Sequence, residues 1–155
     1  MMPRMKLCLL LMLGAAASLP AAPAALPSPR VDVAPMKTSI YVGTVRLTTT
    51  TFVRAGDDFT ATYEARVFPW FFWSETGRIT IHLPLPALAR LAAGETVEFT
   101  GQAVNQKDKP RAVTGRAQRT DATSGRIKVR IMADGVELVF NSTYAFLEAK
   151  LPDRP

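Results

Sequence analysis

The chain has 155 residues, and its 19 lysines and arginines outnumber its 13 aspartates and glutamates, which gives a net charge of +6. This length suits one ordinary domain, and 48% hydrophobic residues are enough to build its core. The single cysteine, Cys8, excludes a disulfide framework, and the absence of an internal repeat argues against a solenoid or propeller.

The first residues have the pattern of a secretory signal peptide. Arg4 and Lys6 form a basic head, residues 7–13 form an apolar run, and small residues occupy 14–17. The pattern predicts a signal peptide over 1–17, with cleavage as late as residue 24 as the alternative. The apolar run is much shorter than the roughly 20 residues of a membrane-spanning helix. We therefore expect an exported protein, periplasmic or extracellular, without a permanent membrane span in its mature form.

A segment rich in proline and alanine follows the predicted signal. Its prolines disfavour helix and central strand, so we expect residues 18–37 to form an extended tether. Apolar and polar residues then alternate, which predicts a single β domain over 38–146. Residues 147–155 are expected to form a tail.

Alternation with period two predicts antiparallel strands joined by short polar turns. It is clearest over 126–131, where three cations point to one face and three branched aliphatic residues to the other. Asp134 and Gly135 then predict a tight hairpin, because both residues tolerate a positive φ. Further strands are expected at residues 39–53, 58–68, 78–83, 95–105 and 111–120.

One short helix interrupts these strands at about residues 85–93. Gly94 is suited to its end, and Leu88 and Leu91 are expected on its buried side. A helix of about two turns is not stable alone, so it must pack on the sheet or close a barrel end. The predicted fold is mainly β, an antiparallel meander that forms a small barrel or strongly coiled sheet with one short capping helix.

The hairpin around Asp108 gives an expectation for register. Symmetric pairing about this residue would set Gly101 opposite Gly115 and Phe99 opposite Ala117. Glycine in strands marks tight coiling or the close approach of another element. We therefore expect the short helix, or the sharpest bend of the barrel, to lie over this strip.

The most unusual local sequence is 68–73, where five aromatic residues occupy six positions. If the chain turns at 74–77, Trp70 and Phe72 face outward beside His82, while Phe71 and Trp73 face the core. Outward aromatic rings would stack on an apolar or amphipathic ligand or dip into a lipid headgroup layer. In the structural alternative the capping helix covers them. The candidate ligand-binding residues are Phe68, Trp70, Phe72, Trp73 and His82.

No constellation of reactive groups is visible in the sequence. His82 is the only histidine, and no second histidine, cysteine or carboxylate cluster accompanies it to bind a metal. No Gly-x-Ser-x-Gly elbow indicates a serine hydrolase. A carboxylate pair for glycoside cleavage is assembled only by folding, so the sequence leaves that alternative open. We predict a protein that is not an enzyme and has no metal or cofactor.

Residues 107–130 carry eight cations against two acids. Alternation places Arg126, Lys128 and Arg130 together outside, and with Arg116 they form a candidate face for an anion or partner. Because an exported protein is not expected to meet nucleic acid, the expected partners are anionic envelope polymers, lipid phosphates or an envelope protein. The alternative is a solvated sheet face that discourages edge pairing.

Segments 97–104, 125–130 and 137–144 resemble those of functionally uncharacterised small secreted β proteins of Gram-negative bacteria. This resemblance implies no activity. The signal, size and strand content are also similar to those of the YceI-like barrels that carry isoprenoid lipids, a likeness of fold.

Two functions are therefore expected. The first is binding of an apolar or amphipathic small ligand, such as a lipid, inside or at the mouth of the barrel. The alternative is docking of another envelope component through the basic strand face or the aromatic edge. An enclosed cavity of roughly 300 Å³ or more would favour the first, and a filled core with an exposed Trp70 would favour the second.

Overall fold

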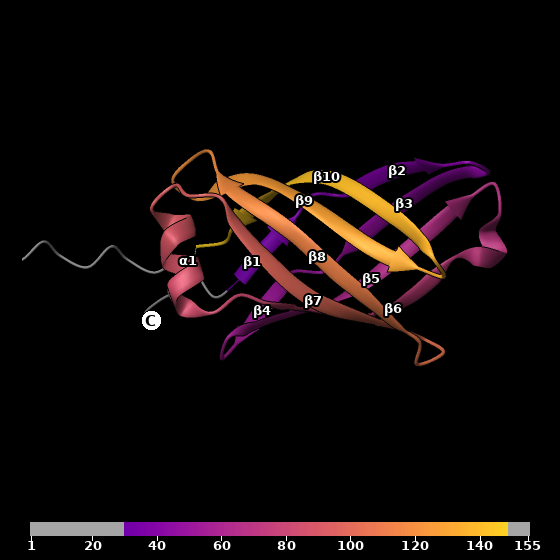
Figure 1. The fold of residues 1–155 in the computed structure, drawn as a ribbon, viewed down its shortest axis with the longest axis horizontal. Helices are drawn as coiled ribbons and strands as arrows, with labels where there is room; N and C mark the ends of the chain where they lie inside the picture. Colours follow the sequence, from indigo (N-terminus) through magenta and orange to yellow (C-terminus); the bar gives the residue numbers. More distant parts are fainter. Residues whose placement is uncertain (1–29, 149–155) are drawn as a thin grey trace, which may run out of the picture.

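The computed structural model describes residues 30–148, which form a closed antiparallel β-barrel of eight strands with one short helix (Figure 1). This confirms the predicted fold class. The predicted signal peptide and its cleavage sites lie outside the described residues, as do most of the predicted tether and tail. Within residues 30–148, no helix is both long enough and apolar enough to cross a bilayer.

The elements follow one another along the chain with short connections. In order they are β1 (Arg30–Val33), β2 (Met36–Ile40), β3 (Gly43–Thr49), β4 (Phe52–Ala55), β5 (Asp58–Phe68), the 3-10 turn η1 (Phe71–Trp73), β6 (Glu75–His82), α1 (Leu85–Ala92), β7 (Val97–Asn105), β8 (Pro110–Arg119), β9 (Ser124–Ala133) and β10 (Val136–Phe146).

The barrel closes because the first strand returns to the last. β1 and β2 act as two halves of one strand, since β1 pairs with β4 while β2 pairs with β3. β5 pairs with both β3 and β4 on one edge and with β6 on the other, and the remaining strands form a meander. β10 then pairs with β1, with Val31 opposite Phe146 and Val33 opposite Tyr144.

The folded unit starts earlier than the sequence predicts. We expected a tether through residue 37, but β1 and the start of β2 belong to the barrel wall. Pro35 occupies the break between these two strands, where a missing N–H costs no ladder hydrogen bond. Met36 is buried beyond it. A strand of four residues beside a proline has too short an alternation to be recognised in the sequence.

The helix and most strands match the predictions. β5 spans residues 58–68 as predicted, whereas the strand expected over 39–53 is divided by the turn at Tyr41 and Val42. α1 caps one end of the barrel (Figure 1), and Leu88 and Leu91 form its buried side. The guanidinium of Arg119 in β8 donates a hydrogen bond to the Ala92 carbonyl at the end of α1.

The predicted register of β7 and β8 is wrong by two residues. Phe99 lies opposite Gly115, and Gly101 lies opposite Val113. The reason is the turn, where the Asn105 side chain accepts hydrogen bonds from the backbone N–H groups of residues 107 and 109 and so shifts the hairpin's centre. A Cβ at Gly115 would collide with the Phe99 ring, so this glycine allows the ring to lie across the strand.

Candidate functional site

The aromatic segment forms the tip of the β5–β6 hairpin, at the end of the barrel opposite α1 (Figure 1). The Trp73 N–H bonds to the Trp70 carbonyl and the Ser74 N–H to the Phe71 carbonyl, each at 3.0 Å, which makes η1 a defined turn. The Val67 N–H donates to Ser74 Oγ at 3.1 Å and closes the base of the tip. The aromatics therefore constitute the turn itself.

All five aromatic side chains of this tip are exposed to solvent. Their exposed fractions lie between 41% for Trp70 and 73% for Phe72. The rings contact one another, with centroid distances of 5.3 Å for Phe72 and Trp73 and 5.7 Å for Phe68 and Phe71. The alternative in which the capping helix covers them is wrong, because α1 lies at the opposite end.

The expected inward orientation of Phe71 and Trp73 is also wrong. The chain turns within the aromatic segment, and β6 begins directly after it at Glu75. Ile79 and Ile81 accordingly pair with Ala61 and Phe59 of β5, and no aromatic of the tip lies opposite them.

A second hairpin tip lies against the first. Tyr41 and Val42, in the turn between β2 and β3, are also exposed, and the Trp70 Nε1–H donates to the Val42 carbonyl at 2.9 Å. A Cβ at Gly43 would collide with the backbone carbonyl of Phe68, so glycine permits this close approach. We call the combined surface the aromatic end. It consists of Tyr41, Val42, Phe68, Trp70, Phe71, Phe72 and Trp73.

Three cations form a row on the outer barrel wall beside this end. Lys37 of β2 lies opposite Arg46 of β3, and Arg46 lies opposite Arg66 of β5. All three residues are exposed. Arg66 forms an ion pair with Glu64 at 2.7 Å. We call Lys37, Arg46 and Arg66 the basic row; sequence reasoning missed it because its members belong to three separate strands.

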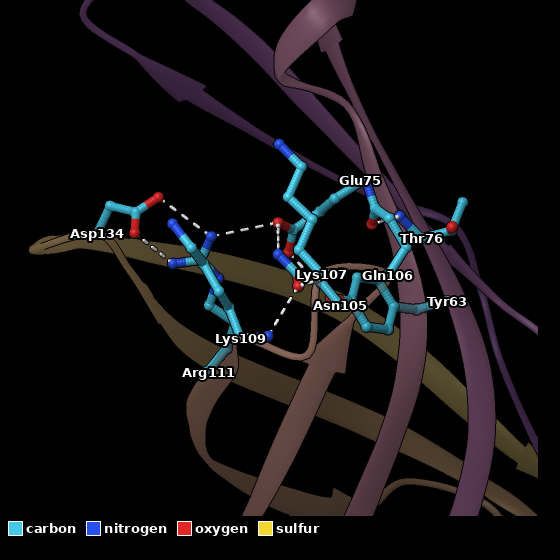
Figure 2. Close-up of polar contacts among 9 residues, drawn as sticks. All are labelled: Tyr63, Glu75, Thr76, Asn105, Gln106, Lys107, Lys109, Arg111 and Asp134. Carbon is cyan, nitrogen blue, oxygen red and sulfur yellow. Dashed lines mark hydrogen bonds and ion pairs between the residues drawn. The ribbon is translucent and has the colours of Figure 1, made fainter.

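A partly buried polar network lies at the same end of the barrel, and Figure 2 shows its contacts. The Arg111 side chain is only 8% exposed and donates to both carboxylate oxygens of Asp134, at 2.7 and 3.1 Å, and to Glu75 Oε2 at 3.2 Å. Tyr63 Oη and Asn105 Nδ2 also donate to Glu75, at 2.9 and 3.1 Å. Glu75 therefore accepts from three side chains just beneath the aromatic turn.

The network shifts the pKa values of its members. The hydrogen bond from Arg111 lowers the pKa of Asp134, and this same bond raises the pKa of Arg111. Burial, followed by the hydrogen bond to Glu75, raises the pKa of Tyr63 above its ordinary value. Both shifts move the pKa values of Asp134 and Tyr63 further from neutral pH, so the contacts of Arg111 with Asp134 and of Tyr63 with Glu75 favour the ionised carboxylate and the protonated phenol.

Arg111 is one of the eight cations counted over residues 107–130, and the structure buries its side chain. The alternation along β8 indicates this burial, because Arg111 lies on the same strand face as the buried Val113 and Ala117. A buried cation requires acidic partners, and these come from β6 and from the turn between β9 and β10.

His82 lies apart from the aromatic end. His82 is the last residue of β6, whereas the aromatic turn comes just before the first residue of this strand. His82 and the aromatic turn therefore lie at opposite ends of β6. Its Nδ1 lies 2.9 Å from Asp58 Oδ1, and both side chains are about half exposed on the outer wall. The structure therefore brings Phe68, Trp70, Phe72 and Trp73 together but leaves His82 out of this group.

The other predicted cations lie on the outer faces of β8 and β9. Arg116 lies opposite Lys128, and Arg126 and Arg130 follow on the same side of β9, as alternation predicts. Arg116, Lys128 and Arg130 line an open groove that continues toward Pro84 and His82. Arg130 pairs with Glu137 at 3.4 Å. Whether this face binds an anion stays a prediction.

The barrel interior is nearly filled by its own side chains. The apolar cavity between α1 and the barrel centre has a volume of about 80 Å³, and its wall includes Phe52, Phe59, Leu91 and Phe99. A second cavity of about 30 Å³ lies beneath the network around Arg111. Both are well below the roughly 300 Å³ of ordinary ligand pockets.

Within residues 30–148, no three histidine, cysteine, aspartate or glutamate side chains are grouped so that they could hold a metal ion. No protein family model, curated protein or solved structure matches this chain.

Proposed function

We propose that this chain is an exported, non-catalytic interaction module that docks onto another component of the bacterial envelope through its aromatic end. Export is supported by the signal pattern of residues 1–17. The observation that carries the proposal is the exposure of seven large apolar side chains on two joined hairpin tips.

Such a surface is costly to leave in water. Contiguous apolar patches are uncommon on monomeric proteins, and burial stabilises by roughly 25 cal/mol per Å² of apolar surface. Hydrogen bonds also hold the two tips in a defined arrangement, since Trp70 bonds to Val42 and η1 has its own backbone hydrogen bonds. A preformed surface loses little conformational entropy when it binds. The aromatic end therefore has the properties of a docking surface.

The filled interior favours docking over ligand carriage. A cavity of about 80 Å³ has no room for an isoprenoid or fatty acyl chain without rearrangement of the barrel. Trp70 is 41% exposed and does not enter that cavity. These are the two features that we expected of an interaction module.

The proposal predicts that Phe71→Ser with Phe72→Ser abolishes most binding to the envelope. Truncation at the centre of a docking surface costs about 2 kcal/mol or more, roughly a 30-fold loss of affinity. The measurement is co-sedimentation of the purified mature protein with a bacterial envelope fraction. The thermal midpoint of unfolding should stay close to that of the wild type, because both rings are more than half exposed.

A matched control replaces two exposed apolar residues at the other end of the barrel. Val53→Ser with Leu85→Ser removes side chains that are 52% and 43% exposed, on β4 and α1. This variant should bind the envelope fraction like the wild type. Equal binding by all three proteins would contradict the proposal.

A further inference from the structure

We propose that the partner of the aromatic end is the surface of a lipid bilayer that carries anionic headgroups. This inference rests on the proposed function and names its partner. It combines the apolar tips with the basic row, which lies on the strands β2, β3 and β5 that lead to these tips.

The aromatic end has the shape expected for shallow insertion. The β2–β3 and β5–β6 tips project beyond the β7–β8 and β9–β10 turns along the long axis of the barrel (Figure 1). Its aromatics include Tyr41, Trp70 and Trp73, which combine an apolar ring with a polar group. Such side chains favour the boundary between lipid tails and water. A projecting tip can enter a bilayer surface without a complementary groove.

Charged and apolar residues are layered along the strands. Ser39, Thr44 and Phe68 pair across β2, β3 and β5 next to the tips, and the basic row lies two residues further back. Two residues of a strand span about 7 Å. The headgroup region on each side of a bilayer is about 5–8 Å thick. Inserted tips would therefore place the basic row level with the lipid phosphates, which long cationic side chains can reach.

The basic row has no evident role in stabilising the barrel. Like charges directly opposite one another on neighbouring strands are destabilising. Among the described residues, Glu64 pairs with Arg66, whereas Lys37 and Arg46 form no ion pair. Anionic headgroups would relieve this repulsion. Charge complementarity thus favours an anionic bilayer over a neutral one.

The test measures binding of the full mature protein to vesicles of phosphatidylcholine, with and without phosphatidylglycerol. The wild type should bind the anionic vesicles more tightly, and added salt should weaken that binding. Neutralisation by Lys37→Gln with Arg46→Gln should reduce affinity for anionic vesicles about 25-fold, because each cation near the surface contributes about 5-fold. Phe71→Ser with Phe72→Ser should reduce binding to both kinds of vesicle.

The matched control removes two positive charges at the other end of the barrel. Arg54→Gln with Arg90→Gln gives the same net charge as the basic-row variant, but Arg54 lies on β4 and Arg90 on α1. It should keep affinity within about 2-fold of the wild type, since surface charges more than a Debye length of ~8–10 Å away are screened. A cooperative thermal unfolding transition, measured for every variant, would show that the variant is folded.

The outcomes separate this inference from the proposed function. Equal affinity for both vesicles, or equal losses in the basic-row and control variants, would overturn the anionic bilayer as partner. If neither vesicle is bound but the envelope fraction still requires Phe71 and Phe72, the bilayer inference is wrong and the partner is another envelope component, a polymer or a protein. If neither vesicles nor envelope depend on these rings, the proposed function fails as well.

Discussion

Replacing Arg111 with methionine should lower the free energy of unfolding by about 3–5 kcal/mol, the usual cost of breaking a buried ion pair. The side chain of Glu75 is only 20% exposed. Without Arg111 its carboxylate would keep only the neutral donors Tyr63 and Asn105. The remaining charge would then be poorly solvated, whereas Asp134, at 71% exposure, would be hydrated. Urea denaturation measures the loss.

The matched double variant shows whether the cost comes from the stranded charge. Arg111→Met with Glu75→Gln removes both charges and keeps an amide that Tyr63 and Asn105 can still contact. It should be more stable than Arg111→Met alone, because a buried pair replaced at both positions is often neutral in cost. If the double variant is less stable than the single one, the network does not act through the charge of Glu75.

Replacing Phe140 with alanine should destabilise the barrel by about 3–5 kcal/mol, through lost apolar burial and the cavity left behind. Phe140 is 1% exposed and lines the small cavity beneath the network of Arg111. The neighbouring strands cannot move easily into the cavity left by the ring, because their backbone hydrogen bonds fix their positions in the sheet. Urea denaturation again gives the value.

Phe72→Ala is the control for this core substitution. It removes the same atoms from a ring that is 73% exposed, and its effect on stability should stay within about 0.5 kcal/mol. A large loss at Phe72 would mean that the aromatic end is part of the structural core. A small loss at Phe140 would mean that the barrel interior repacks freely.

Local patterns carried most of the fold prediction. The alternation over residues 126–131 gave the orientation of β9, and Asp134 with Gly135 gave the turn to β10. The spacing of Leu88 and Leu91 identified the buried side of α1. Each of these signals depends on neighbours within a few residues, so no knowledge of distant contacts was needed.

The missed features depend on pairing between distant segments. β1 is recognisable only through its partners β4 and β10. The register of β7 with β8 is a local exception, because it depends on hydrogen bonds of the Asn105 side chain within the turn. The ion pairs of Arg111 could not be predicted, because Asp134 and Glu75 approach it only in the folded barrel.

The sequence predicted only the part of the candidate site whose residues are neighbours along the chain. Phe68, Trp70, Phe72 and Trp73 are adjacent in sequence, so their clustering could be expected. Tyr41 and Val42 join them through a bond between two hairpins, and the basic row is assembled by the register of three strands. His82 was grouped with the aromatics because the turn was expected after Trp73 rather than within the segment.

The placement of β1 also affects how the protein can be shortened. β1 pairs with β10 on one side and with β4 on the other. A fragment that begins at Thr38, the start of the domain expected from sequence, would leave the facing edges of both strands without partners. Open strand edges are templates for pairing between chains. Fragments used for expression or crystallisation should therefore retain β1 through β10, residues 30–146, to avoid self-association through the opened wall.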